Sequence, residues 1–136
     1  MAEKGRVFLE RLPKEGDLVE EITKFVKKNN IEKGIVKAIG AVTEAKIGYY
    51  NQEAEEYEYT KLNQHLEIVS LLGNISILDG EPMVHAHIAL ADDEGRTYGG
   101  HLAEGTKIFA TELYVEEIKG EKKIRTKDKE TNLTLW

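Results

Sequence analysis

Residues 84–101, with the sequence VHAHIALADDEGRTYGGH, predict a β-hairpin. The first eight of these residues are compatible with a β-strand and contain neither Gly nor Pro. The segment Asp93-Glu94-Gly95 matches a three-residue hairpin loop in which Gly takes the left-handed conformation. With that loop, Asp92 pairs with Arg96, and this pair sets the register of both strands.

Three of the four histidines of the chain fall on one face of this predicted hairpin. The register places His87 directly opposite His101, and His85 lies on the same face because side chains alternate with a period of two. Opposed Cβ atoms are about 4.5–5.5 Å apart and diagonal ones roughly 7–8 Å apart, which lets imidazoles converge on one metal ion. The opposite face of the first strand is an ordinary core lining, formed by Val84, Ala86, Ile88 and Leu90.

Two alternatives to a metal site stay open at this point. An isolated His-X-His pair is more often partly buried and hydrogen-bonded than metal-binding. A four-residue loop would also shift the register by one and turn His101 to the other face. The remaining residues on the histidine face are small, which predicts a hollow around the imidazoles; they are Ala89, Ala91, Thr97, Gly99 and Ala103.

The composition limits the chemistry that the chain can support. Its 136 residues predict a single domain, spanning residues 1–136. Cysteine is absent, so any metal site must use histidine, carboxylates or backbone oxygens. With 25 acidic against 19 basic residues and a formal charge of −6, the surface on average repels phosphate backbones. No apolar run reaches roughly 18 residues and the N-terminus does not look like a signal peptide, so we expect a cytoplasmic protein with no membrane partner.

One amphipathic helix is predicted near the N-terminus. Asp17 is the expected N-cap, with Glu20 as its capping-box partner, and Asn29-Asn30 ends the helix. An apolar stripe at helical spacing is assigned to the core and given no binding role; it consists of Leu18, Val19, Ile22, Phe25 and Val26.

The rest of the pattern is β almost throughout. We predict strands over residues 5–12, 34–42, 45–50, 57–62, 65–72, 83–91, 96–102, 108–118 and 123–126. Residues 79–82 and 120–122 mark turns, and residues 51–58 are expected to form a loop or a solvated edge hairpin. One main helix packed on a curved, mostly antiparallel sheet is an α+β fold.

Two further acidic or basic features lie on predicted strands. His65 and Glu67 share one face and are candidates for a fourth metal ligand or for a hydrogen bond to a ligand, the alternative being a surface salt bridge. Glu112 lies inside a β-forming run, where it would need a partner if buried or else would face water.

An ordered set of short motifs runs along the chain. They are GRV at residues 5–7, LLGNIS at 71–76, DGEPMVHAH at 79–87, GGHL at 99–102 and GT at 105–106. This set closely resembles the plants-and-prokaryotes-conserved domain family, called PPC or PCC, over essentially the whole chain. The resemblance implies an α+β fold and a homotrimer. It also implies that His85, His87 and His101 are the ligands, as in metal-containing members of the family.

In plant relatives this domain follows an AT-hook, which inserts an Arg-Gly-Arg core into the minor groove of A·T-rich DNA. The present sequence contains no Arg-Gly-Arg-Pro motif, and its cationic stretch at residues 119–129 is interrupted by Glu121 and Asp128. A DNA-associated regulatory module is therefore an alternative that would need a trimer to gather its basic residues around an axis. Those residues are Lys119, Lys122, Lys123, Arg125 and Lys127.

The leading hypothesis is a small homotrimeric zinc-binding protein whose three-histidine site leaves a fourth position for water or a small anionic ligand. Three neutral imidazoles suit Zn²⁺, and other divalent transition metals follow by the usual affinity order. Further alternatives are an interaction scaffold with a structural metal and a metal-dependent hydrolase or lyase acting on a small anionic ligand. No Gly-X-Ser-X-Gly or His-Glu-X-X-His motif is present, and Ser70 and Ser76 have no assigned partner, so the sequence assigns no catalytic residue and leaves enzymatic activity an open alternative.

Overall fold

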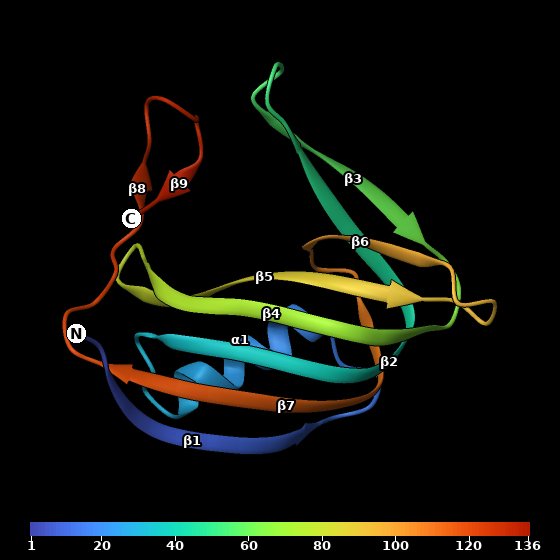
Figure 1. The fold of residues 1–136 in the computed structure, drawn as a ribbon, viewed down its shortest axis with the longest axis horizontal. Coiled ribbons are helices and arrows are strands. Elements are labelled where there is room, and N and C mark those ends of the chain that lie inside the picture. Colours follow the sequence, from blue (N-terminus) through green and yellow to red (C-terminus); the bar gives the residue numbers. More distant parts are fainter.

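Seven antiparallel strands and one helix form the body of the protein in the computed structural model, which describes residues 1–136 (Figure 1). The helix α1 lies against one face of the sheet, where it packs on β5 and β7. This confirms the predicted α+β class. The elements are β1 (Glu3–Leu12), α1 (Leu18–Lys28), β2 (Gly34–Asn51), β3 (Glu56–Leu62), β4 (Leu66–Leu78), β5 (Glu81–Ala91), β6 (Thr97–Leu102), β7 (Lys107–Lys119), β8 (Thr126–Lys127) and β9 (Thr134–Leu135).

The long strand β2 curls the sheet back on itself. The strands follow the order β1-β7-β2-β4-β5-β6, and the second half of β2 pairs with β3 and also with β6. The strands β2, β4, β5 and β6 therefore close into a small barrel. Gly100 allows this closure, because a Cβ atom there would lie only 2.6 Å from the carbonyl oxygen of Gly48.

Two predicted strands, residues 34–42 and 45–50, are one continuous strand in the structure, so that prediction was wrong. Register shifts lie between Ala38 and Gly40 and again between Ala41 and Glu44. Such β-bulges bend and twist a strand without ending it. The segment that the sequence pattern treats as a break is therefore the bend that redirects β2 from the main sheet to the barrel.

The helix forms as its sequence predicts. The Asp17 carboxylate caps it by accepting a hydrogen bond from the backbone N–H of Glu20 at 3.1 Å, although the return bond from the Glu20 side chain is absent. Leu18, Ile22 and Val26 of the predicted stripe are fully buried in the core. The helix is the only one, with 11 residues, and it is neither long nor apolar enough to cross a membrane.

The strand β4 extends well beyond its predicted end at residue 72. Residues 73–78 continue to pair with β5, so β4 and β5 form one long hairpin. Its turn is shorter than the predicted 79–82, because Glu81 and Pro82 already pair with β4. Gly73 and Asn74 are poor strand formers, which is why the local pattern stops early. The predicted C-terminal strand, residues 123–126, is also shifted: Ile124 forms an isolated parallel bridge with Ile77, and β8 begins at Thr126.

Residues 51–58 form the tip of a hairpin between β2 and β3, which confirms one of the two expectations for this segment. Figure 1 shows this hairpin and the β8–β9 hairpin rising on the same side of β4 and β5. The Tyr50 hydroxyl donates a hydrogen bond to the carbonyl oxygen of Thr131 at 2.6 Å, which joins the two hairpins.

Candidate metal centre

The hairpin formed by β5 and β6 has the predicted three-residue loop. The Asp92 N–H donates to the carbonyl oxygen of Arg96 at 3.0 Å, and Gly95 closes the loop with a φ of 77°. The Asp92 carboxylate accepts hydrogen bonds from the backbone N–H groups of Glu94 and Arg96, the Arg96 Nε and the Tyr98 hydroxyl. Desolvation acts to raise the pKa of Asp92, but these hydrogen bonds outweigh it and lower the pKa to about 2.

The strand register that follows from this loop is the predicted one. His87 pairs directly with His101, so the alternative four-residue loop is wrong. Three of the four predicted core residues, Ala86, Ile88 and Leu90, are buried on the opposite face, and Val84 is partly buried against the same core. The hairpin therefore builds core with one face and presents its histidines on the other.

His85, His87 and His101 come together as one cluster. Their ring centroids are 5.2 Å apart for His85 and His87, 5.1 Å for His85 and His101, and 6.0 Å for His87 and His101. One nitrogen from each ring lies within 4.8 Å of the other two. Zinc binds imidazole nitrogens at roughly 2.0–2.1 Å, so the three rings lie close enough together to be candidates for one shared ion.

Two of the three imidazoles, those of His85 and His101, are held in their neutral form by their surroundings. Burial lowers the pKa of His85 to about 4, with further contributions from the neighbouring His101, Arg125 and His87. Burial and the proximity of His87 also lower the pKa of His101. Unprotonated imidazole is the form that binds a metal ion, so the environment prepares both rings for that role.

Two ring nitrogens of the cluster have no hydrogen-bond partner although they are buried. They are the Nε2 atom of His85 and the Nδ1 atom of His101. Buried polar atoms in folded proteins are nearly always satisfied, because an unmet hydrogen bond costs about 1–3 kcal/mol. A metal ion that accepts both lone pairs would remove this cost, so the residues present fit such an ion.

Sequence reasoning missed two residues that lie beside the cluster. The Tyr57 ring, from β3, lies 4.9 Å from the ring of His101. Arg125 donates a hydrogen bond to Asn74, which pairs with His85 across β4 and β5. Neither residue is close to the hairpin in sequence, and no local pattern marks either of them.

The burial of Arg125 also changes the interpretation of the cationic C-terminal stretch. Arg125 is 6% exposed and cannot contribute to a basic surface. Lys119 forms an ion pair with Glu3 at 3.3 Å, and Lys122 forms one with Glu32. Of the five basic residues considered for DNA contact, three are therefore buried or already paired with an acid.

His65 and Glu67 do not join the histidine cluster. Glu67 pairs with Ala91, which lies four residues along β5 from His87. His65 and Glu67 line a separate hollow, together with Asp92 and other side chains. They form no ion pair with each other, so neither predicted alternative is present. Glu112 faces water on the exposed side of β7.

A cavity of about 710 Å³ opens next to the cluster and reaches His101. Of the small residues expected to border a hollow, Ala103 lines this cavity. Its wall also contains Lys46 and Tyr59, whose ammonium group and ring are 4.8 Å apart.

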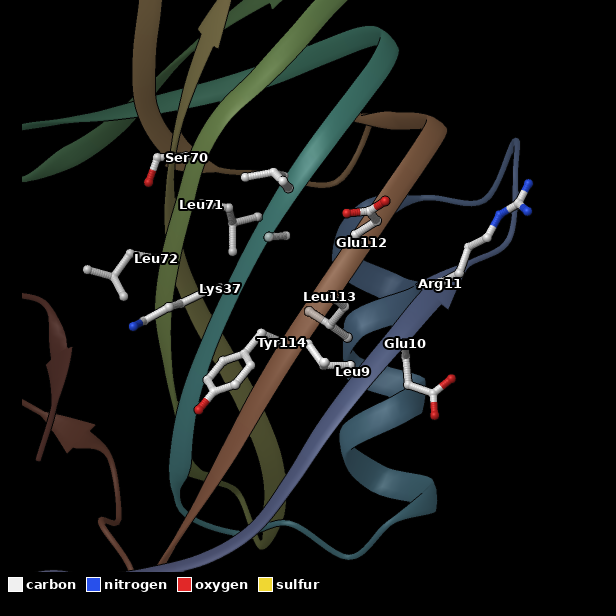
Figure 2. A pocket seen from close by; sticks show the side chains of 12 residues that line it. Leu9, Glu10, Arg11, Lys37, Ser70, Leu71, Leu72, Glu112, Leu113 and Tyr114 are labelled. Atoms are coloured by element: carbon white, nitrogen blue, oxygen red, sulfur yellow. The ribbon is translucent and has the colours of Figure 1, made fainter.

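A second hollow, of about 700 Å³, lies on the exposed face of the sheet (Figure 2). Figure 2 shows α1 behind the strands, on the other side from these side chains. Leu9, Ile39 and Leu72 line the hollow and are 79%, 56% and 57% exposed. Leu72 pairs with His87, so this apolar surface borders the histidine cluster.

The fold and the cluster together define a one-helix α+β protein with a candidate transition-metal centre on a hairpin. The model of the Plants and Prokaryotes Conserved (PCC) domain matches residues 1–119. The chain therefore belongs to the PCC domain family.

Solved structures resemble the chain over its whole length. A metal-containing protein from Archaeoglobus fulgidus is 43% identical with a TM-score of 0.95, and the match covers 100% of this chain and 96% of that one. A plant- and prokaryote-conserved protein from Pyrococcus horikoshii is also 43% identical with a TM-score of 0.95, covering 100% and 94%. A structure from Bacteroides thetaiotaomicron, provisionally named a DNA-binding protein, is 24% identical with a TM-score of 0.88 over 99% and 96% of the two chains, which shows the fold alone.

The curated relatives are much longer proteins. The bifunctional protein GlmU of Synechococcus sp. strain JA-3-3Ab is 37% identical over 107 residues, which cover 78% of this chain. The GlmU protein of a second Synechococcus strain is 32% identical over 96 residues, or 70% of this chain. The chain spans only 16% and 14% of the lengths of these two relatives.

Proposed function

We propose that this protein is a metal-binding PCC-domain protein in which His85, His87 and His101 hold one divalent transition-metal ion. The observation that carries the proposal is the pair of buried ring nitrogens without a partner, one on His85 and one on His101. The 43% identity to a metal-containing protein from Archaeoglobus fulgidus supports it.

Zinc is the proposed metal. Three neutral imidazoles without a thiolate suit Zn²⁺, and Co²⁺, Ni²⁺ and Cu²⁺ would also bind such ligands. His87 is exposed, so solvent reaches the cluster from its side. A three-histidine site of this kind leaves a fourth position for water or a small anion, and a zinc ion there would supply Lewis acidity.

We also propose that the protein assembles as a homotrimer, the state implied by the family resemblance. The apolar hollow around Leu9, Ile39 and Leu72 supports an assembly, because large exposed apolar surfaces in soluble proteins usually mark an interface. The pairing of Leu72 with His87 would bring such an interface close to the metal centre.

DNA binding is not adopted as a second function. The protein has a formal charge of −6, and the burial of Arg125 and the ion pairs of Lys119 and Lys122 reduce the basic surface further. The likeness to the structure from Bacteroides thetaiotaomicron extends to the fold and carries no information about DNA.

Metal analysis of tag-free protein tests the main proposal. We expect one zinc ion per chain in the wild type after zinc is offered and free metal is removed. His87→Ala should lose this ion and keep its fold, because His87 is exposed on the face away from the core. His65→Ala is the matched control, since His65 lies outside the cluster, and it should retain the ion. A full complement of zinc in His87→Ala, or no uptake by the wild type, would contradict the proposal.

A further inference from the structure

One buried arginine beside the histidine cluster has no negatively charged partner. The Arg125 side chain donates from Nε to the Ser76 hydroxyl at 2.6 Å, from Nη2 to the Asn74 Oδ1 atom at 2.9 Å and from Nη1 to the Thr134 carbonyl oxygen at 2.9 Å. The Trp136 ring lies 4.6 Å from its central carbon. All of these partners are neutral, and none of the ion pairs in the protein includes Arg125.

The position of Arg125 is set by the C-terminal segment. This segment runs beside the end of β4, where the Ile77 N–H donates to Lys123 and the Arg125 N–H donates to Ile77, both at 2.8 Å. Asn74, which accepts from the guanidinium group, pairs with His85. Directly paired residues share a face of the sheet and have Cβ atoms about 4.5–5.5 Å apart, so the guanidinium group lies next to the cluster.

The charges around the cluster are unbalanced. Arg125 is 6% exposed, and a buried charge is costly unless an opposite charge compensates it. The cluster itself contains three histidines and no carboxylate, so a bound divalent ion would add further positive charge. The protein as a whole is negative, with a formal charge of −6, which makes this local excess of positive charge a distinct feature.

We propose that Arg125 is the anion-recognition residue of this site, and that the site takes a small ligand bearing a carboxylate or phosphate group. A guanidinium group forms strong, directional hydrogen bonds with both kinds of oxyanion, and a divalent metal ion attracts the same oxygens. This inference rests on the proposed metal site and adds to it the chemical class of the ligand. Because Arg125 lies beyond residues 1–119, it stands outside the part of the chain that the family model matches.

The low exposure of Arg125 favours a small ligand over a macromolecule. The guanidinium group is covered by Trp136 on one side and held by Ser76 and Asn74 of β4. The phosphate backbone of a nucleic acid would need cations at the surface, and the guanidinium group of Arg125 is recessed below it.

Cobalt-substituted protein provides the test, because Co²⁺ bound by three histidines absorbs visible light and reports a change in its ligands. We expect inorganic phosphate, acetate or both to alter this spectrum in the wild type, and the comparison of the two anions identifies the ligand class. Arg125→Met should weaken the response roughly tenfold or more, because a hydrogen bond to a charged group is lost. Arg125→Lys keeps the positive charge and loses the planar guanidinium group with its several N–H donors. This variant should bind the anion with an intermediate affinity.

Lys127→Met is the matched control. It removes one positive charge from the same segment, at an exposed lysine whose ammonium group donates a hydrogen bond to the carbonyl oxygen of Asn132, and it should bind anions like the wild type. Equal anion affinity in Arg125→Met and Lys127→Met would overturn the inference while leaving the metal proposal intact. Two results with the wild type alone would also overturn the inference, even if Arg125→Met failed to fold. One is a spectral response that sodium chloride reproduces at equal ionic strength. The other is no response to either anion.

The cobalt content of each sample separates the two proposals. If the wild type takes up no cobalt, the metal proposal fails. The anion site is then tested on metal-free protein, whose melting temperature should rise when phosphate or acetate is added. Arg125→Met should lack this rise, and Lys127→Met should keep it.

Discussion

Acidification should release metal from this site at a lower pH than from an ordinary three-histidine site. A proton competes with the metal for each imidazole, so affinity falls once the pH drops below the pKa of a free ligand. An ordinary imidazole has a pKa of about 6.5. Burial lowers the pKa of His85 to about 4 and also lowers that of His101. The His85 ring therefore stays unprotonated through the mildly acidic range, and the His101 ring takes up its proton at a lower pH than an ordinary imidazole does.

The size of the effect follows from these values. At a pH of about 5.5, one ordinary imidazole is roughly nine-tenths protonated and weakens metal binding about tenfold, so three would weaken it about a thousandfold. An imidazole with a pKa of about 4, like that of His85, is only about 3% protonated at that pH and weakens binding negligibly. Because His101 shifts in the same direction, the total loss should be far smaller than a thousandfold.

The measurement is a zinc competition titration against a chromophoric chelator between about pH 7.5 and pH 5.5. Ionic strength is held constant and the chelator is corrected for its own protonation. A loss of affinity near a thousandfold, beginning as the pH passes about 6.5, would refute the reasoning, because it would show that burial does not lower the pKa of His85 and His101.

Three other predictions concern the metal, the core and the assembly. At a zinc concentration 100 times the dissociation constant, binding should add about 2.7 kcal/mol to the free energy of unfolding. For a chain of this length, removing the zinc with a chelator should therefore lower the melting temperature by roughly 9 °C. Calorimetry that detected no shift would argue against binding to the folded state. Leu90 is 0% exposed, so Leu90→Ala should destabilise the fold by about 2–5 kcal/mol in denaturant titrations. The folded variant should still bind zinc at the wild-type stoichiometry. A loss of zinc would show that the core face and the histidine face of the hairpin depend on each other. Ile39→Glu places a charge in the apolar hollow that is the proposed interface. The molecular mass measured by light scattering should fall from three times 15.4 kDa to that of one chain, and an unchanged trimer would place the interface elsewhere.

The sequence alone determined the hairpin and the histidine cluster. The loop chemistry of Asp92 to Gly95 and the period of two along each strand act over a few residues, so they predict the pairing of His87 with His101, and the structure excludes the other register. The same holds for the helix, whose cap and apolar stripe are local features.

Only the tertiary structure decided how the cluster is surrounded. The bulges of β2 close the barrel and bring Tyr57 to His101, and the return of the C-terminal segment buries Arg125 beside His85. The sequence pattern groups Arg125 with exposed lysines, since a basic residue in a charged stretch usually faces water. These contacts join residues that are far apart in the chain and follow no period. They depend on the path of the whole backbone, and so do the exposure of each side chain and the lowered pKa of His85.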